Sequence, residues 1–166
     1  MSIKEQTKVV QDLVKKFGEE NVTDTKVPRL YRAFATIKRE VFRDVVKYLK
    51  EKHGFVHIVT ISGVDLKDRY EVVYHLRSEG FNMNLKVPVP KDDPKVPSIT
   101  DILNGAVLYE REVNDLLGVF PEGHPDPKRL ILDYDWPEGV HPLRKEWDIQ
   151  TLREKVDGKK WGKDVE

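Results

Sequence analysis

Cysteine is absent from this sequence of 166 residues. Its absence excludes disulfides, thiolate metal sites, iron–sulfur ligation and cysteine nucleophiles from this chain. An excess of charge of one sign is also missing, because 29 lysine and arginine residues balance 29 aspartate and glutamate residues. A nucleic-acid-binding protein usually concentrates a basic excess on one face, so the balanced charge argues against that class. No apolar run reaches the roughly 18 residues of a transmembrane helix, and the charged start is not typical of a signal peptide.

Thermolabile side chains are scarce as well. The chain has two methionines and three glutamines, while charged residues make up 35% of it. This composition favours a heat-loving source, with ordinary compositional drift as the alternative. Leucine, isoleucine, valine and phenylalanine together still fill 50 positions. That is enough apolar material for the core of one folded domain.

The hydrophobic pattern of residues 1–97 predicts an α+β domain. Apolar residues recur at helical spacing in two segments, and four other segments are apolar or alternate with a period of two. The expected helices are residues 2–17 and 38–53, and the expected strands are residues 30–37, 55–61, 70–77 and 83–89. This order predicts a mixed sheet of about four strands with helices on one face. Because Pro88 and Pro90 cannot donate to a strand ladder, the last strand is expected to end at, or form, a sheet edge.

A third helix is expected over residues 98–118. Ser98 and Asp101 have the spacing of a capping box, and an apolar stripe at helical spacing follows them. Gly105 is a candidate for a kink or a break in this helix. Gly118 is placed where a left-handed residue commonly ends a helix.

Residues 119–166, which we call the arm, show no sustained period. Nine of the ten prolines lie between Pro88 and Pro142. A long segment without regular structure is usually functional or is ordered by something else. The large apolar side chains of the arm either pack back on the sheet or bind a partner. We favour a partner, because Trp, Tyr and Arg dominate interfaces and prolines lower the entropy lost on docking.

The densest polar cluster lies on the third expected helix. Arg111 and Asp115 are four residues apart, and Glu112 and Asp115 are three apart, so the members of each pair are neighbours on the helix surface. Paired carboxylates can carry out acid–base catalysis when burial separates their pKa values. A solvated helix face linked by salt bridges is the simpler interpretation. Tyr109 and Val113 bring the apolar stripe against these charges, which suits ionic groups at the edge of a contact surface.

Other kinds of site have little support. His124, Asp126 and His141 do not have the spacing of a zinc site. A histidine before proline more often bonds locally, because that residue is held in extended geometry. The sequence contains no G-x-S-x-G elbow, no dinucleotide-binding loop and no Walker loop. Nothing in it argues for a cofactor in this chain.

Three ordered motifs lie between Tyr109 and Asp148. ERE at 110–112 is followed by GHPD at 123–126, and then by DW with PLRK further along. In this order and spacing they resemble the 30-kDa subunit family of respiratory complex I (the C subunit of NADH dehydrogenase) and its relatives in membrane-bound NiFe hydrogenases. The resemblance covers about residues 56–148. Leu108 and Lys128 depart from the family pattern, which speaks against the NADH–quinone branch proper.

The resemblance, together with the chemistry of the arm, implies a site for a partner subunit. The ERE and GHPD residues would lie at or near that contact, and the arm would wrap the neighbour. The expected partner-binding residues are Glu110, Arg111, Glu112, Asp115, Gly118, Gly123, His124, Pro125, Asp126, Arg129, Trp136, Pro142, Leu143, Arg144, Lys145 and Trp147.

The family further implies a cofactor-free peripheral subunit on the cytoplasmic face of the membrane, with no active site of its own. Its direct partner would be a hydrogenase-like large subunit, beside a small iron–sulfur subunit and antiporter-like membrane subunits. The NiFe centre and the iron–sulfur clusters would lie in those partners. Taken with the composition, this favours an archaeal, ion-translocating membrane-bound hydrogenase. The alternatives are a sulfur-reducing, quinone-linked or F420-linked complex, a free-standing assembly factor, or an enzyme that uses the acidic cluster.

The neutral total hides an uneven distribution of charge. Residues 1–97 contain 19 basic and 14 acidic side chains, whereas residues 98–166 contain 10 basic and 15 acidic ones. The arm and the helix before it are therefore acidic, and they are expected to meet a basic surface on the partner.

Overall fold

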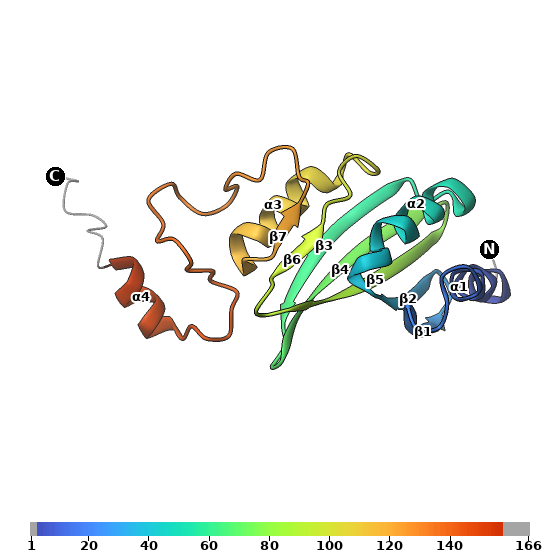
Figure 1. The fold of residues 1–166 in the computed structure, drawn as a ribbon, viewed down its shortest axis with the longest axis horizontal. Coiled ribbons are helices and arrows are strands. Elements are labelled where there is room, and N and C mark those ends of the chain that lie inside the picture. The colour runs from blue at the N-terminus through green and yellow to red at the C-terminus, as the bar shows by residue number, and fades with distance from the viewer. Residues whose placement is uncertain (1–2, 158–166) are drawn as a thin grey trace.

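The computed structural model describes residues 3–157. Residues 1–2 and 158–166, which include the start of the first expected helix and the end of the arm, lie outside the described residues. Figure 1 shows the arrangement of the elements. In chain order they are α1 (Ile3–Phe17), β1 (Val22–Arg29), β2 (Arg32–Ile37), the 3-10 turn η1 (Arg39–Val41), α2 (Phe42–His53), β3 (His57–Asp65), β4 (Arg69–Ser78), β5 (Phe81–Pro90), β6 (Lys95–Pro97), α3 (Ala106–Leu117), β7 (Phe120–Glu122) and α4 (Ile149–Asp157).

The main sheet has five strands in the order β1-β2-β5-β4-β3. β2 and β5 run parallel and the other neighbours are antiparallel, which confirms the mixed sheet of an α+β fold. The additional strand, β1, was not expected from the sequence. Val22 is its only buried residue, and Asp24 has a left-handed φ of 44° within a ladder that is interrupted by register shifts. Such an irregular, exposed edge strand leaves no period of two to detect.

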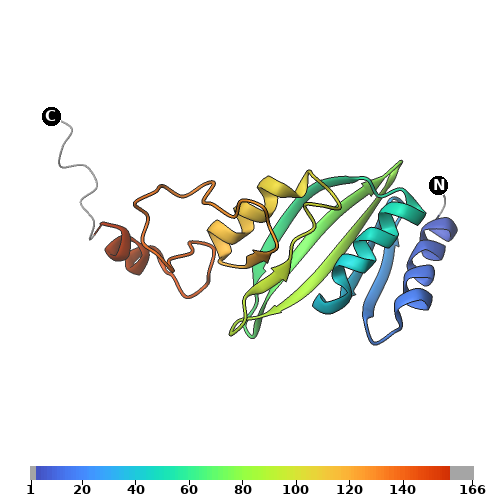
Figure 2. The ribbon, with the colours of Figure 1, turned by 45° about the horizontal axis from the view of Figure 1, so that its top comes forward.

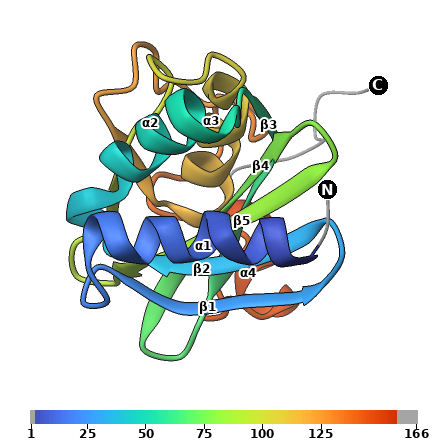
Figure 3. The same ribbon diagram turned by 90° about the vertical axis from the view of Figure 1, so that its right-hand side faces the viewer.

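Helices α1, α2 and α3 cover one face of the sheet, as the sequence predicts (Figure 3). The ring of Phe42 on α2 lies 4.4 Å from the ring of Tyr74 on β4. Gly63 on β3 lies against Leu117 of α3, and a Cβ there would be only 2.6 Å from that side chain. The core is the layer between these helices and the alternate residues of β2, β4 and β5.

Strand β5 lies in the centre of the sheet, so the prediction that it forms an edge is wrong. It pairs with β4 along its whole length, but its pairing with β2 ends at Lys86. Pro88 and Pro90 follow that point, where the strand has a neighbour on one side only. The prolines therefore cost no ladder hydrogen bond on the β2 side. The expectation that proline lies where a strand lacks a neighbour holds for the end of β5, but not for the strand as a whole.

Helix α3 begins at Ala106 and not at Ser98. Gly105 stands at its N-cap, and the Ser98 hydroxyl bonds within its own turn, at 2.9 Å from the hydroxyl of Thr100 and 3.3 Å from the Thr100 nitrogen. Gly105 therefore marks a complete break in the expected helix. Gly118 ends α3 as predicted, with a left-handed φ of 77°.

The described part of the arm is mostly extended, with two short regular elements. β7 pairs in parallel with β6, and α4 begins after Asp148, whose carboxylate accepts a hydrogen bond from the Thr151 nitrogen at 2.8 Å. The expectation of an arm without regular elements is wrong at these two places. Figure 2 shows the arm and α4 extending beyond the end of the sheet opposite α1. No helix within residues 3–157 is both long and apolar enough to cross a membrane.

Candidate functional site

The motif residues gather where the arm folds back on α3, beside β3. Arg111 donates from Nε to the carbonyl of Lys128 at 2.8 Å and from Nη2 to that of Arg129 at 2.7 Å. One turn later on the same helix, Asp115 Oδ2 accepts from the next three backbone nitrogens of the arm, those of residues 130–132, at 3.1, 2.8 and 2.8 Å. A cation thus binds consecutive carbonyls and an anion binds consecutive amides. Arg111 and Asp115 are neighbours on the helix, where a salt bridge between them was the simpler interpretation, but both side chains bind the arm instead.

A second segment of the arm, residues 141–144, satisfies the carbonyls at the end of α3. An α-helix leaves its last four carbonyls without partners in the helix. His141 Nδ1 donates to the carbonyl of Asp115 at 2.9 Å, and the Leu143 nitrogen donates to that of Leu116 at 3.0 Å. Arg144 Nε donates to the carbonyl of Leu117 at 2.9 Å. The guanidinium also places a positive charge at the negative end of the helix dipole.

Gly118 is required by this contact as well as by its own backbone. A Cβ at this position would lie 2.3 Å from Arg144 Nη2 and 2.5 Å from the ring of His141. Such distances are too short for any side chain, so the glycine allows the arm to approach the end of the helix.

The arm is also bound to the sheet through Asp65, at the end of β3. Its side chain, 3% exposed, accepts from the Lys145 nitrogen at 2.8 Å and pairs with Lys91 Nζ at 2.6 Å. Burial alone would raise the pKa of Asp65, but these two partners outweigh it and hold the pKa below its ordinary value. The guanidinium of Arg144 lies 5.3 Å from the ring centroid of Tyr70, a cation–π contact that fixes the same segment. Asp65, Tyr70 and Lys91 belong to none of the motifs and lie far from them along the chain, so no signal in the sequence marks them as part of this site.

Glu110 points into the core and is only 2% exposed. Its Oε1 accepts from the Ile99 nitrogen at 2.8 Å and so holds the loop that precedes α3. Burial raises the pKa of this carboxyl. Its other oxygen has no hydrogen-bond partner among the described residues.

Glu112 is half-buried beside a hollow of about 240 Å³ between β3 and α3. Two carboxylates of the cluster thus have separate structural tasks, since Glu110 holds the loop before α3 and Asp115 holds the arm.

His124 is bonded locally, as predicted from its position before proline. Its Nδ1 accepts from the Asp126 nitrogen at 3.0 Å, which leaves Nε2 to donate to the carbonyl of Val107 at 3.0 Å. Both ring nitrogens are thus occupied by the backbone. Within residues 3–157, no group of three His, Cys, Asp or Glu side chains could hold a metal ion.

The other expected site residues stiffen the arm. Trp136 Nε1 donates to the carbonyl of Val140 at 2.8 Å, and Arg129 Nη1 donates to that of Asp133 at 3.3 Å. Asp126 pairs with Lys128 at 3.4 Å. Trp147 buries its ring nitrogen without a partner among the described residues. Gly123 supplies a left-handed turn with φ of 83°, and Pro125 and Pro142 each follow a histidine whose ring bonds the backbone of α3.

Several polar groups of the arm bond to α3 or to its own backbone, and the arm leaves large apolar side chains in solvent. Ile131 is 56% exposed, Leu143 54% and Tyr134 98%. Leu108, on the first turns of α3, is 54% exposed. The arm therefore packs back on its parent domain, which is the first of the two interpretations, while partner binding by its exposed side chains stays a prediction.

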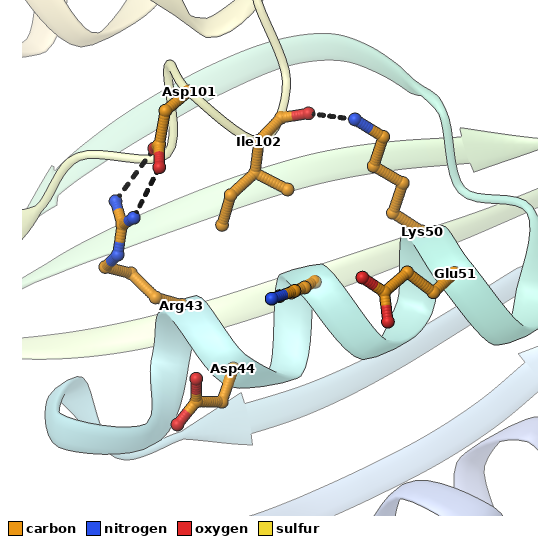
Figure 4. A pocket seen from close by; sticks show the side chains of 7 residues that line it. Arg43, Asp44, Lys50, Glu51, Asp101 and Ile102 are labelled. Carbon is orange, nitrogen blue, oxygen red and sulfur yellow. Dashed lines mark hydrogen bonds and ion pairs between the residues drawn. The ribbon is translucent and has the colours of Figure 1, made fainter.

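Another hollow, of about 400 Å³, lies between α2 and the loop that contains Asp101 and Ile102 (Figure 4). Arg43 binds the Asp101 carboxylate in bidentate fashion at 2.9 and 2.6 Å, and Lys50 donates to the carbonyl of Ile102 at 2.5 Å. Cationic and anionic side chains alternate around its wall. This mixture gives neither a phosphate cradle nor a charged catalytic centre.

Comparison with known proteins gives the same family as the motifs. The family described as respiratory-chain NADH dehydrogenase, 30-kDa subunit, matches residues 35–153. The C subunit of the NADH-quinone oxidoreductase of Phenylobacterium zucineum is 45% identical over 105 residues, which are 61% of this chain and 49% of that protein. The chain thus spans about half the length of this relative.

Two further relatives belong to other complexes. The C subunit of the F420H2 dehydrogenase of Methanosarcina mazei is 33% identical over 144 residues, which cover 84% of this chain and 90% of that one. Hydrogenase-4 component G of Escherichia coli is 40% identical over 125 residues, 71% of this chain and 22% of that one.

A solved structure supports the fold over nearly the whole chain. A chain of the membrane-bound sulfane sulfur reductase, an archaeal respiratory membrane complex, superposes with a TM-score of 0.75 at 25% identity, covering 98% of this chain and 95% of that one. The family model, the relatives and the superposed fold therefore indicate the same family. The chain belongs to the family of the 30-kDa subunit of respiratory-chain NADH dehydrogenase.

Proposed function

We propose that the chain is a subunit of a membrane-bound oxidoreductase complex related to respiratory complex I, and that α3 and the arm dock its hydrogenase-like large subunit. The observation that carries this proposal is that polar contacts hold the arm on α3 while large apolar side chains of the arm remain exposed. Asp115 of α3 binds the backbone of the arm, and His141 and Arg144 of the arm bind the backbone of α3. Ile131 and Tyr134 of the same arm stay exposed. Exposed large apolar side chains on a rigid segment are typical of a protein interface.

The branch we favour is the membrane-bound, ion-translocating hydrogenase, in which the NiFe centre and iron–sulfur clusters are held by partner subunits. Similarity to hydrogenase-4 component G supports it. In this proposal the chain itself is free of cofactors and sits peripherally on the cytoplasmic face, reaching the membrane only through its partners. These partners would include the small iron–sulfur subunit and the antiporter-like membrane subunits.

A second candidate is the equivalent subunit of an F420-linked or sulfur-reducing complex. The relative in the F420H2 dehydrogenase is matched over 90% of its length, and the sulfane sulfur reductase chain over 95% of its length. Both candidates place the same surface against a large subunit. They differ in the electron donor and acceptor, which other chains would bind.

Co-purification with the large subunit tests the docking. Ile131→Ser with Tyr134→Ser removes two exposed side chains without touching a bond that holds the arm. The proposal predicts that this variant folds as the wild type does but is lost from the complex. Ile3→Ser with Val64→Ser, also at exposed positions, is the matched control and stays in the complex. Equal retention of the two variants would contradict the proposal.

A further inference from the structure

The face of the five-stranded sheet opposite the helices carries positive charge at one end. The strand register places Arg32 beside Asn82, Asn82 beside Arg77, and Arg77 beside His57. Neighbouring strands are about 4.8 Å apart, so these four side chains form a line across β2, β5, β4 and β3. We call them the cationic row.

The two arginines of the row are not neutralised by an ion pair within the described residues. Arg32 and Arg77 are both exposed and neither forms an ion pair there, although Arg39, Arg43 and Arg69 each pair with an aspartate. The next two rows of the open face contain no acidic residue. By register they are Phe34, Asn84, His75 and Thr60, followed by Thr36, Lys86, Val73 and Ser62. The first carboxylate on β4, Glu71, lies further along and faces Lys86 at 3.6 Å.

Beneath the row lies a fixed polar floor. Asn84 is 4% exposed and donates from Nδ2 to the carbonyl of Ala33 at 2.8 Å. Its Oδ1 must then accept from His75 Nδ1, at 2.6 Å, and the other ring nitrogen, His75 Nε2, lies 3.2 Å from the Ser62 hydroxyl, to which it is hydrogen-bonded. A hollow of about 190 Å³ lies over this floor, with Arg32 and Arg77 in its walls. The hollow is therefore preformed, and its rim is positive.

A strained turn stands beside the same end of the sheet. Tyr31 has a φ of 67°, a left-handed conformation that side chains other than glycine rarely adopt. It is held by Gln6, a buried residue whose Oε1 accepts from the Tyr31 nitrogen at 3.1 Å, and by the Asn82 nitrogen, which donates to the Tyr31 carbonyl at 3.0 Å. The turn exposes Leu30 and, at 47%, Tyr31. Backbone strain that the surrounding structure maintains is concentrated at functional sites.

We infer that this end of the open sheet face is a second docking surface, which binds a carboxylate-rich segment of a partner subunit. The carboxylates would pair with Arg32 and Arg77 over the hollow, in the bidentate geometry that guanidinium groups favour. Apolar side chains of the same segment would contact Leu30 and Tyr31. Tyrosine and arginine are the residues that contribute most to binding at protein interfaces.

An anionic membrane surface is the other possible source of negative charge. Lipid binding by surface charge uses clusters of about four to eight lysines and arginines. The row has two arginines and one histidine, and Arg29 on β1 lies beside Arg32, so the arginines stay below that number, and the row lies over a structured polar floor. These features fit a protein segment better than a lipid surface.

The inference rests on the proposed function only in requiring a complex, since its surface is separate from the arm. Arginine-specific labelling with phenylglyoxal, read by mass spectrometry, compares the isolated chain with the purified complex. We expect Arg32 and Arg77 to be labelled in the isolated chain and at least about fivefold protected in the complex. If Tyr134 is protected from oxidative footprinting in that complex but both arginines are labelled as in the isolated chain, this inference is wrong while the arm proposal stands.

Charge reversal gives a second test. Arg32→Glu with Arg77→Glu should lower the salt concentration at which the chain leaves the complex by about threefold. Lys47→Glu with Lys52→Glu makes the same change in net charge at exposed positions of α2 and should leave that concentration unchanged. Equal salt resistance of the two variants would overturn the inference. So would arginine-dependent co-sedimentation of the isolated chain with vesicles of phosphatidylserine and phosphatidylcholine, which would assign the row to the membrane.

Discussion

Asp115 Oδ2 accepts a hydrogen bond from the Ile131 nitrogen at 2.8 Å, between two further bonds from the neighbouring amides of the arm. Asp115 is 5% exposed, so these amides replace the water that its charge would otherwise bind. The carboxylate thus joins α3 to a segment that has no regular structure of its own. It explains how the arm stays ordered where the sequence shows no hydrophobic period.

We predict that Asp115→Asn releases residues 130–132. A hydrogen bond to a charged group contributes about 1.5–3 kcal/mol, and asparagine loses the charge that three amides share. Amide exchange of Ile131 should rise at least about tenfold, the factor that roughly 1.4 kcal/mol of local stability represents. Glu112→Gln, which removes a carboxylate from the same helix without breaking a bond to the arm, is the control. Similar exchange in the two variants would show that Asp115 does not hold the arm.

Gly118→Ala is expected to separate the arm from the end of α3. A left-handed alanine costs about 1–2 kcal/mol, and its Cβ would also displace Arg144 and His141. Gly139→Ala carries a similar φ of 74° but has no atom within 4 Å of the added Cβ, so it reports the backbone cost alone. Chemical denaturation should show a larger loss of stability for Gly118→Ala. Equal losses would mean that the approach of Arg144 contributes nothing.

Considered by itself, the Glu110 carboxyl should make the free energy of unfolding larger at acid pH than at neutral pH. Because burial raises its folded-state pKa, its favourable contribution is complete below the unfolded-state value of about 4.3 and is lost as pH rises through the folded pKa. Glu110→Gln keeps an oxygen for the Ile99 nitrogen and removes the charge. Between pH 4 and 7 the free energy of unfolding of the variant should therefore fall less than that of the wild type. An unchanged pH profile would contradict the assignment.

His141 gives the arm a sensitivity of the opposite sign. Burial lowers its pKa, so its contribution is present above the unfolded-state value of about 6.5 and is lost as pH falls through the folded pKa. The end of α3 should lose its contact with residues 141–144 on mild acidification. Amide exchange at Leu143, corrected for its intrinsic pH dependence, measures this loss. His141→Asn can still donate to the Asp115 carbonyl but does not titrate, so it should abolish the effect, and an unaltered dependence would assign it to another group.

The sequence predicts the elements of the sheet better than the way the arm is held. Strands β3, β4 and β5 and helices α1 and α2 follow from their hydrophobic periods, and Gly118 marks the end of α3. Strand β1 is not predicted by the sequence pattern, because it is an irregular edge strand that buries only Val22. The early start assigned to α3 shows that apolar spacing across Gly105 does not distinguish a helix from a turn that packs on the same core.

The candidate site shows the same limit at the level of side chains. The motifs single out Arg111, Asp115 and Arg144, but their partners are backbone carbonyls and amides, which every residue carries and no motif reveals. Asp65 lies 80 positions before Lys145, and only the fold brings the two together. Partner binding by the exposed residues, the acidic arm meeting a basic partner surface, and a thermophilic source all stay predictions.

The central claim is that the arm docks a partner subunit through its exposed apolar side chains. Oxidative footprinting of Tyr134 tests it most directly, because this side chain is 98% exposed in the isolated chain. Its rate of modification is measured in the isolated chain and in the purified complex with the large subunit. The account predicts rapid modification of the isolated chain and at least about tenfold protection in the complex, whereas equal modification in both would contradict it.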